Sequence, residues 1–227
     1  MKNYWHISGP SEAPKAPCLA FYKYDGSNLR FEWSKKRGWY KQGTRRRLFD
    51  ETDKEFGGAI EVFQETYADD LAKIFTGKSF TKEYRNIRQF IVFCEYFGPH
   101  SFAGIHQPED QMELVLFDVN PHKKGILLPR VFLKHFGHLK VPEVVYEGNF
   151  NKQFVRDVID GKYPVDEGVV AKGFTVGKKT SPEHGLWMAK IKTRSWMERL
   201  QEKAKTVAAL RQVLLENERE QYDGSVD

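Results

Sequence analysis

The segment Phe21-Tyr22-Lys23-Tyr24-Asp25-Gly26-Ser27-Asn28-Leu29-Arg30 places a lysine among aromatic residues, just before a turn and a second strand-like stretch. Aromatic neighbours shield such a lysine from water, and desolvation lowers the pKa of a lysine amine, which can then act as a nucleophile. Asp25-Gly26 supplies the turn, because glycine tolerates the backbone conformations that tight turns require. The alternative is an ordinary hairpin turn with a solvated lysine, and this short motif alone favours that alternative.

Composition limits the classes to which the chain can belong. It has 227 residues, of which 40% are hydrophobic and 14% aromatic, and its formal net charge is +5. These values predict a globular protein with a substantial core and suit a polyanionic partner. We expect no membrane association, since no apolar run is long enough to cross a bilayer and residues 1–20 lack a signal-peptide core. The two distant cysteines, Cys18 and Cys94, are typical of reduced thiols, so we expect a cytoplasmic protein, in the host cytoplasm if a phage encodes it.

Hydrophobic periodicity predicts an α+β fold built on antiparallel sheets and flanked by helices. Strands and helices interleave along the chain, but without a strict βαβ rhythm. The predicted strands are 28–33, 38–42, 89–97, 112–119, 144–146, 168–172 and 187–192. The predicted helices are 55–75, 129–136, 151–159 and a long final helix at about 195–218, with Val207 on its apolar face. Gly77 ends the first of these helices.

Several of these strands carry charged residues where an apolar residue would fit the pattern. Glu95 interrupts the run from Phe90 to Phe97, and Glu167 precedes Gly-Val-Val-Ala. A buried carboxylate costs several kcal/mol unless it is paired or faces a site. Lys190 and Lys192 alternate with apolar residues, so both amines project from one face of a strand. A phosphate between these lysines and the nucleophile would explain them; a half-exposed strand with a row of solvated lysines is the alternative.

In their order along the chain, these residues resemble the motifs of covalent nucleotidyltransferases, the superfamily of polynucleotide ligases and mRNA capping enzymes. The motifs are Lys23-Tyr-Asp-Gly26, Glu95 within Phe-Cys-Glu-Tyr-Phe-Gly, Phe117-Asp118, Glu167-Gly-Val-Val-Ala-Lys172 and Lys190-Ile-Lys192. DNA ligases and capping enzymes usually carry an arginine where this chain has Asn28. The sequence is therefore most similar to ATP-dependent RNA ligases of the phage and RNA-editing type, which have an ATP-grasp-like ligase domain.

The resemblance implies an activity and a role for each of the residues. Lys23 would attack the α-phosphate of ATP, carry AMP as a phosphoramidate and pass it to an RNA 5′-phosphate, after which a 3′-hydroxyl seals the strand. Lys190 and Lys192 would neutralise the transition-state charge, and Glu167 with Asp25 would hold Mg²⁺ or Mn²⁺. The nucleotide would be bound by Tyr22, Asn28, Arg45, Glu95 at the ribose and Phe117 at the adenine.

Two further basic segments are candidates for contacts to RNA. Arg45, in the basic cluster 45–47, is the choice for a phosphate-binding arginine, and a merely solvated basic loop is the alternative. This cluster and Lys178-Lys179 are candidates for contacts to the RNA backbone.

The resemblance also has departures. Ligases usually carry a second domain, often an OB-fold, after the last motif, whereas only residues 193–227 follow it here. We therefore expect a nucleotidyltransferase domain at 1–193, a C-terminal amphipathic helix and tail at 194–227, and no room for an OB-fold. A protein partner or a second copy would replace the missing domain. The alternative functions are a minimal DNA ligase, a guanylyltransferase or an inactive RNA-binding relative.

Overall fold

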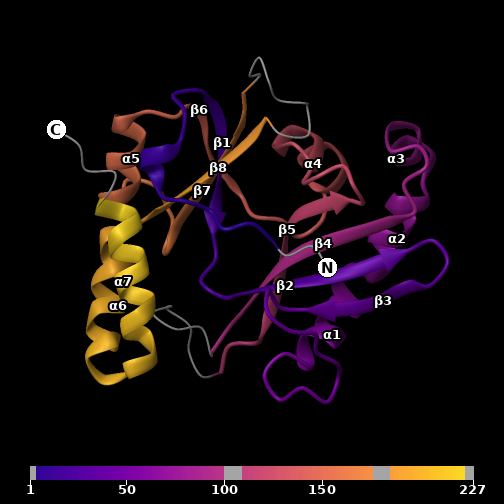
Figure 1. Cartoon of the computed structure of the whole chain (residues 1–227), viewed down its shortest axis with the longest axis horizontal. Coiled ribbons are helices and arrows are strands. Elements are labelled where there is room, and N and C mark those ends of the chain that lie inside the picture. The colour runs from indigo at the N-terminus through magenta and orange to yellow at the C-terminus, as the bar shows by residue number, and fades with distance from the viewer. Residues whose placement is uncertain (1–3, 100–108, 176–184, 223–227) are drawn as a thin grey trace. The chain divides into compact units, whose positions relative to one another are not determined.

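The computed structural model describes residues 4–99, 109–175 and 185–222. The described chain forms two compact units. Residue 4 and residues 26–99 and 109–141 make up unit 1, and residues 5–25, 142–175 and 185–222 make up unit 2. Each unit combines a four-stranded antiparallel sheet with helices, so the predicted α+β class with antiparallel sheets is confirmed (Figure 1).

The sheet of unit 1 has the strand order β3-β2-β4-β5. Its strands are β2 (Ser27–Ser34), β3 (Gly38–Gly43), β4 (Gln89–Phe97) and β5 (Glu113–Pro121). Period-two alternation in β2 places Leu29, Phe31 and Trp33 on one face, where all three are buried in the core. The predicted strands 28–33 and 38–42 are present as β2 and β3, which form an antiparallel hairpin across Lys35–Arg37.

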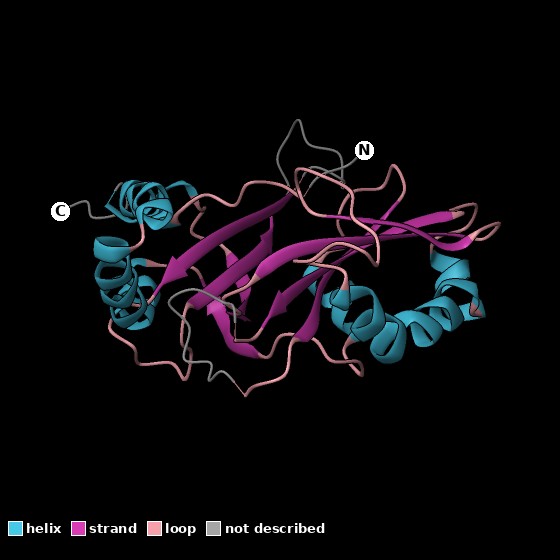
Figure 2. Ribbon diagram, turned by 90° about the horizontal axis from the view of Figure 1, so that it is seen from below, coloured by secondary structure: helices cyan, strands magenta, loops and turns pink. Residues whose placement is uncertain are grey.

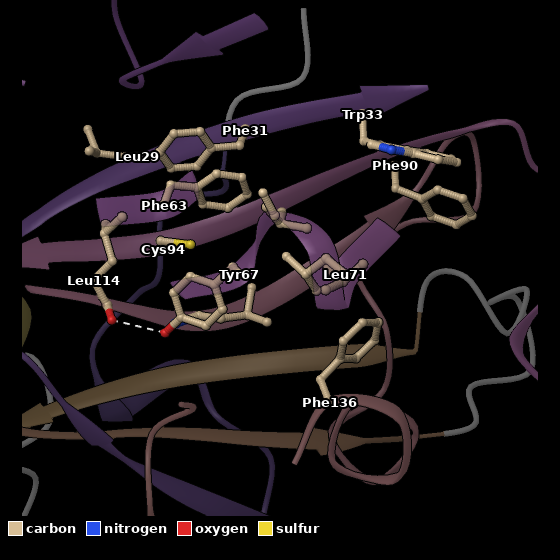
Figure 3. Packing of buried hydrophobic residues seen from close by; sticks show 14 of the residues in the cluster. Leu29, Phe31, Trp33, Phe63, Tyr67, Leu71, Phe90, Cys94, Leu114 and Phe136 are labelled. Atoms are coloured by element: carbon tan, nitrogen blue, oxygen red, sulfur yellow. Dashed lines mark hydrogen bonds between the residues drawn. The ribbon is translucent and has the colours of Figure 1, made fainter. Parts of the chain in front are cut away.

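Helices cover the apolar face of this sheet, as Figure 2 shows for the helices and strands of unit 1. The helical segments are α1 (Gly58–Phe63), a π-helical turn (Gln64–Ala68), α2 (Asp69–Thr76), α3 (Lys78–Glu83) and α4 (Pro129–Phe136). Phe31 and Phe63 stack with their ring centroids 3.8 Å apart, and the buried Tyr67 hydroxyl donates to the Leu114 carbonyl over 2.9 Å (Figure 3). The predicted helix 55–75 thus exists with its apolar stripe on the core, but it contains a π-helical turn.

The sheet of unit 2 has the strand order β6-β1-β7-β8. Its strands are β1 (Pro17–Lys23), β6 (Val144–Asn149), β7 (Gly168–Phe174) and β8 (Leu186–Lys192). The other elements are a 3₁₀ turn (Pro10–Glu12), α5 (Lys152–Ile159), α6 (Arg194–Thr206) and α7 (Ala208–Tyr222). The Asn151 side chain accepts from the Phe154 N–H and so begins α5.

The predicted long final helix is wrong. Two helices, α6 and α7, lie side by side, and Val207 between them is extended and exposed instead of lying on an apolar face (Figure 1). Leu210 and Leu214 of α7 pack against Trp196 and Leu200 of α6. Folding the helix back in this way lets both segments bury the same apolar stripe. No helix of the described segments is long and apolar enough to cross a membrane.

Candidate active site

Strand register brings the lysines of unit 2 to one face of its sheet. Lys23 of β1 lies opposite Gly168 of β7, which lies opposite Lys192 of β8. Directly paired residues project from the same face, so Lys23 and Lys192 flank Gly168, and Lys190 shares that face two residues away. The other face is apolar and packs with α5, through Ala20, Val169, Ala171, Ala189 and Ile191. The helix covers the apolar face, so chemistry is confined to the face that carries the lysines.

Gly168 keeps these two lysines close to the intervening carboxylate. Its φ is +147°, a conformation that side chains rarely adopt, and a Cβ there would collide with the backbone carbonyl of Ile191. Only glycine therefore allows β7 and β8 to pair at this position directly after Glu167.

Glu167 joins the two lysines electrostatically. Its Oε2 lies 2.6 Å from Nζ of Lys23 and its Oε1 lies 2.7 Å from Nζ of Lys192, while its side chain is only 3% exposed. Burial by itself raises the pKa of this carboxyl, but the charges of Lys192 and Lys23 outweigh burial and hold the pKa below its ordinary value. The nucleophile candidate is thus held in place by a carboxylate that stays ionised.

Lys192 is a buried cation of this cluster. Burial lowers its pKa to about 8, although the Glu167 carboxylate opposes this shift. Its Nζ lies 3.5 Å from the ring centroid of the fully buried Trp196, a distance at which the ring stabilises a cation. Lys192 therefore lies between a carboxylate and an aromatic face.

Thr193 fixes the start of α6 relative to this carboxylate. Its hydroxyl accepts from the Trp196 N–H over 3.2 Å and donates to the Asp166 carbonyl over 2.6 Å. Its own N–H donates to the Glu167 carbonyl over 2.9 Å. This cap positions Trp196 over Lys192 and ties the helix to the strand that bears Glu167.

Asp25 is the second carboxylate of the cluster and is buried. Burial first and the charge of Glu167 second raise its pKa to about 7, while Lys23 opposes them. Its Oδ2 is buried and accepts no well-formed hydrogen bond from the described residues, although the Trp196 side chain helps to lower the pKa of this carboxyl. A divalent cation fits such an oxygen, because Mg²⁺ prefers a few hard carboxylate ligands and retains water. The described residues contain no group of three or more potential metal ligands. Within this cluster, Asp25 and Glu167 are the carboxylates that could bind such a cation.

The other predicted site residues form a cluster in unit 1, on the sheet face opposite its helices. Asn28 of β2 lies opposite Glu95 of β4, and Arg30 opposite Phe93. These residues alternate with Leu29, Val92 and Cys94 of the core, so their side chains project away from it. Asn28 and Glu95 are half-buried, in keeping with residues that line a binding surface.

Phe117 lies at a β-bulge. The register of β4 and β5 shifts between Phe93 and Cys94, which pair with Asp118 and Leu116, so Phe117 is the extra residue of β5 at this shift. A bulge redirects a side chain, and Phe117 is half-buried, whereas its neighbours in β5 from Leu114 to Pro121 are buried. The predicted strand 112–119 is present as β5, which continues to Pro121, so the motif Phe117-Asp118 lies inside the strand.

Tyr4 completes this cluster and was not predicted. Its hydroxyl donates to the buried Asp118 carboxylate, and its ring makes edge contacts to Phe117 and Phe93, with centroids 5.1 and 4.9 Å away. Burial and the charge of Asp118 raise its pKa. The sequence gives no pattern around Tyr4 that could have predicted this role.

Arg45 is the arginine of the basic loop that acts on this cluster. Its positive charge lowers the pKa of Tyr4, whereas Glu95 raises it. Arg47 instead forms an ion pair with Asp53 and lies 3.4 Å from Glu55. The Thr44 hydroxyl accepts from the N–H groups of Arg46 and Arg47, each over 3.1 Å, which shapes the loop.

The structure thus brings the predicted residues into two clusters. In unit 2 the cluster contains Lys23, Asp25, Glu167, Lys190 and Lys192, and in unit 1 it contains Asn28, Arg45, Glu95 and Phe117. Tyr22 pairs with Val169, so it lies on the sheet face that packs with α5 and is not brought to the lysines. Tyr22 is half-buried beside Tyr24, with ring centroids 4.6 Å apart. Lys178-Lys179 lie outside the described residues. The contact of Trp196 with Lys192 was not predicted, because Lys192 ends β8 and Trp196 lies in α6, so no single periodicity relates the two residues.

We compared the chain with known protein families, curated sequences and solved structures. A scan against protein-family models and a search of curated protein sequences both found no match. Among solved structures, the RNA ligase of Naegleria gruberi with pyrophosphate is 14% identical with a TM-score of 0.59, and the alignment covers 89% of this chain and 58% of that one. A structure of the same ligase with ATP and manganese gives 13% identity, a TM-score of 0.57 and coverages of 87% and 58%.

A structure from Aquifex aeolicus that is assigned as an ATP-dependent DNA ligase is 17% identical with a TM-score of 0.52, covering 96% of this chain and 60% of that one. This chain therefore spans less than two thirds of the length of these ligases. At such identities the likeness concerns the fold. The chain has the nucleotidyltransferase fold of RNA ligases and ATP-dependent DNA ligases.

Proposed function

We propose that this chain is the adenylylating part of an ATP-dependent RNA ligase, in which Lys23 accepts AMP from ATP. One observation supports the proposal above all: Lys23 and Lys192 each form an ion pair with one oxygen of the buried Glu167 carboxylate. These ion pairs lie on the polar face of the sheet, opposite the face that packs in the apolar core. A buried carboxylate with two ammonium groups is costly unless it serves a site. A nucleophilic lysine beside a second buried cation suits phosphoryl chemistry.

The proposed first step forms a bond between Lys23 Nζ and the α-phosphorus of ATP. The bond between that phosphorus and the pyrophosphate oxygen breaks, pyrophosphate leaves, and the amine loses its proton to solvent. Lys192, with its pKa lowered to about 8, and Lys190 neutralise the charge that develops on the phosphate oxygens. Glu167 holds both Lys23 and Lys192 in position before the nucleotide binds.

Glu167 and Asp25 would hold the divalent cation that such a reaction uses. When bound, Mg²⁺ or Mn²⁺ supplies charge neutralisation to phosphate oxygens. Both oxygens of Glu167 already contact ammonium groups, so Asp25 Oδ2 is the better candidate for a direct ligand, with Glu167 acting through water. A solved structure of a mutant of the Naegleria gruberi RNA ligase contains ATP and manganese, which supports a nucleotide and a divalent metal here.

The cluster in unit 1 would bind the nucleoside. Phe117 offers a half-buried ring for the adenine, and Glu95 offers a carboxylate for a ribose hydroxyl. Asn28 pairs with Glu95 across the sheet and would position phosphate or the RNA end. Arg45, exposed beside the Tyr4–Asp118 pair, would contact phosphate.

The second part of the proposal concerns the nucleic acid. The AMP would pass to an RNA 5′-phosphate, and an RNA 3′-hydroxyl would then attack that phosphate and release AMP. Asn28, at a position where DNA ligases usually have arginine, favours RNA, as does the fold of the Naegleria gruberi RNA ligase. The similarity to an ATP-dependent DNA ligase makes DNA ligation the second candidate.

The test of the first step is incubation with ATP labelled at the α-phosphate and Mg²⁺, followed by denaturing electrophoresis and mapping of the adduct. We expect label on the protein, lost in Lys23→Ala and retained in Lys54→Ala, an exposed lysine elsewhere in the chain. Absence of label on the unaltered protein would refute the proposal, and so would label that survives Lys23→Ala.

Substrate choice needs a separate experiment. The adenylylated protein is incubated with nicked duplex RNA, single-stranded RNA and nicked duplex DNA, all with 5′-phosphate and 3′-hydroxyl ends. We expect transfer of AMP to RNA ends. Transfer to DNA alone would favour the DNA ligase, and a GMP adduct formed from GTP would favour a guanylyltransferase.

A further inference from the structure

A basic hollow lies at one end of the sheet in unit 1, away from the predicted site residues. It has a volume of about 1200 Å³ and is formed by the β2–β3 turn, the residues before β4 and the loop after β5. Six of the side chains that line it carry a positive charge: Lys35, Lys36, Arg37, Arg88, Lys123 and Lys124. His122 lines it as well, and none of its described lining residues is a carboxylate.

The six cationic residues are exposed, so their charges are accessible from the solvent. Like charges repel one another, and gathering six of them around one hollow raises the local positive potential. Arg37 is ordered by its contact with the Tyr40 ring, whose centroid lies 3.7 Å from the guanidinium carbon. Such a surface attracts a polyanion with several charges, since single ions would leave most of the repulsion in place.

Backbone hydrogen bonds hold the three segments of the hollow together. The Lys35 N–H donates to the Arg88 carbonyl and the His122 N–H donates to the Gln89 carbonyl, both over 3.0 Å. The Lys124 N–H donates to the Pro121 carbonyl over 2.9 Å. The cations are therefore carried by a connected framework, which lowers the entropy cost of presenting them together.

Backbone strain is concentrated at the same place. Asn86 and Lys123 have φ values of +72° and +64°, and among the described residues they are the only ones other than glycine with positive φ. Both line the hollow. Such conformations cost roughly 1–3 kcal/mol each and tend to occur at functional sites. At Lys123 this unusual backbone conformation belongs to one of the six cationic residues that line the hollow.

The hollow is separate from the nucleoside cluster of unit 1. Strand pairing places Asn28 opposite Glu95 at one end of the sheet and Ser34 opposite Gln89 at the other. Six residues of strand span about 20 Å. A ligand that filled the hollow would thus occupy space beyond the nucleotide.

We propose that this hollow binds backbone phosphates of the nucleic acid substrate, beyond the ends that are joined. This inference rests on the proposed function, because it assigns a second contact to the same substrate. Ile87 is the hydrophobic residue that lines the hollow, and among its described lining residues there is no Phe, Tyr or Trp ring on which bases could stack, only the imidazole of His122. The contact is therefore to phosphates, independent of base sequence, and sensitive to salt.

The test compares two triple variants of equal net charge. Lys35→Gln/Lys36→Gln/Lys123→Gln removes three cations of the hollow, and Lys54→Gln/Lys78→Gln/Lys82→Gln removes three exposed lysines of unit 1 outside it. Binding of fluorescein-labelled duplex RNA is followed by anisotropy over a series of salt concentrations, without ATP. Duplex DNA and poly-glutamate serve as competitors.

We expect the hollow variant to lose about tenfold or more in affinity for RNA, and its salt dependence to fall by roughly one unit of slope for each lysine removed. The control variant should bind nearly as the unaltered protein does. Duplex DNA should compete for the same surface through the same phosphates, and poly-glutamate should compete much less well. Adenylylation of Lys23, measured without nucleic acid, should be equal in all three proteins.

Other outcomes would overturn the inference. Equal losses in the two variants would mean that only net charge matters, and competition by poly-glutamate as strong as by RNA would indicate an acidic protein partner. Loss of binding to DNA with RNA binding intact would separate the hollow from the proposed substrate. A protein that binds RNA through the hollow but never forms an adduct would refute the proposed enzymatic function and leave this inference standing.

Discussion

The Nζ atom of Lys192 lies 2.7 Å from Oε1 of Glu167, and the Lys192 side chain is only 10% exposed. The charge of Lys192 is therefore both buried and paired. Burial has the larger effect and lowers the pKa of Lys192 to about 8, within the range in which ligation can be assayed. In the proposed mechanism the ammonium form of Lys192 is the active form. Part of its charge is therefore lost just above neutral pH.

The first prediction concerns the pH dependence of adenylylation. As pH rises above about 8, Lys192 loses its proton and no longer neutralises the phosphate, so the rate of adduct formation should fall. Lys192→Arg should react more slowly at pH 7 but lose this alkaline decline, because a guanidinium stays protonated to above pH 12. Single-turnover rates with labelled ATP from pH 6 to 10 measure both effects.

Lys190→Arg is the matched control for this prediction. It changes a neighbouring lysine on the same strand and leaves Lys192 in place, so the decline above pH 8 should remain. An alkaline decline that persists in Lys192→Arg would assign the titration to another group.

The second prediction concerns Trp196, which we interpret as a positioning residue for Lys192. The indole ring lies 3.5 Å from the ammonium and stabilises its charged form. Removing the ring in Trp196→Leu should lower the pKa of Lys192 further, by roughly one unit if the contact contributes about 1–2 kcal/mol. The alkaline decline of adenylylation should then begin at lower pH.

Trp196→Phe is the control, since it retains an aromatic ring. Both variants should lose stability, because Trp196 is fully buried. The position of the alkaline decline separates the two roles. Equal positions in Trp196→Leu and the unaltered protein would mean that Trp196 is only a core residue.

Those parts of the fold that depend on local periodicity could be predicted from the sequence. The alternation of Leu29, Phe31 and Trp33 with polar residues marks a strand with one apolar face, and the structure has that strand. The polar residues of its other face, Arg30, Glu32 and Ser34, are buried as well, which alternation alone did not indicate. The lysine pair of β8 was placed on one face by the same reasoning, and Lys192 is indeed directed to Glu167. Alternation fixes the face of a side chain but not its partner across the sheet.

Other features depend on register and on contacts that are distant in sequence. The bulge at Phe117 arises from how β4 and β5 pair, and no residue type marks it in advance. Tyr4 reaches Asp118 across 114 positions of sequence, so no local pattern could predict it. The break at Val207 divides a continuous apolar periodicity, which is why the sequence predicted one helix.

The third prediction concerns stability and Asp25. Burial raises its pKa to about 7 in the folded protein, above the ordinary value of 3.8. A carboxyl with a raised pKa binds more protons in the folded than in the unfolded state, so stability is lost as pH rises from about 4 to 7. Asp25→Asn removes this penalty, which is at most about 4 kcal/mol for three units. The variant should thus gain stability over the unaltered protein between pH 5 and pH 8.

Urea denaturation at both pH values, with and without Mg²⁺, tests this. Mg²⁺ should stabilise the unaltered protein at pH 8, where Asp25 is ionised, and should have a smaller effect on Asp25→Asn. A stability difference that does not change with pH would show that Asp25 titrates normally. An equal effect of Mg²⁺ on both proteins would remove Asp25 from the proposed metal ligands.

The last prediction concerns Gly168, which lies between Lys23 and Lys192. Gly168→Ala combines a strained φ of +147° with a collision at the Ile191 carbonyl, so β7 and β8 must move apart there. We expect a loss of more than about 3 kcal/mol in the free energy of unfolding, since strain alone costs roughly 1–3 kcal/mol. Adenylylation should fall as well, because β8 carries Lys192 and would separate it from Glu167.

Gly161 of the same unit separates strain from collision. Its φ is +72°, and a Cβ there would meet no atom within 4 Å, so Gly161→Ala carries the backbone strain alone. Urea denaturation should give it a loss of about 1 kcal/mol, with adenylylation unchanged. If the two variants lost equal stability, the close approach of Ile191 would not constrain the strands. The spacing of Lys23 and Lys192 about Glu167 would then depend on their own ion pairs.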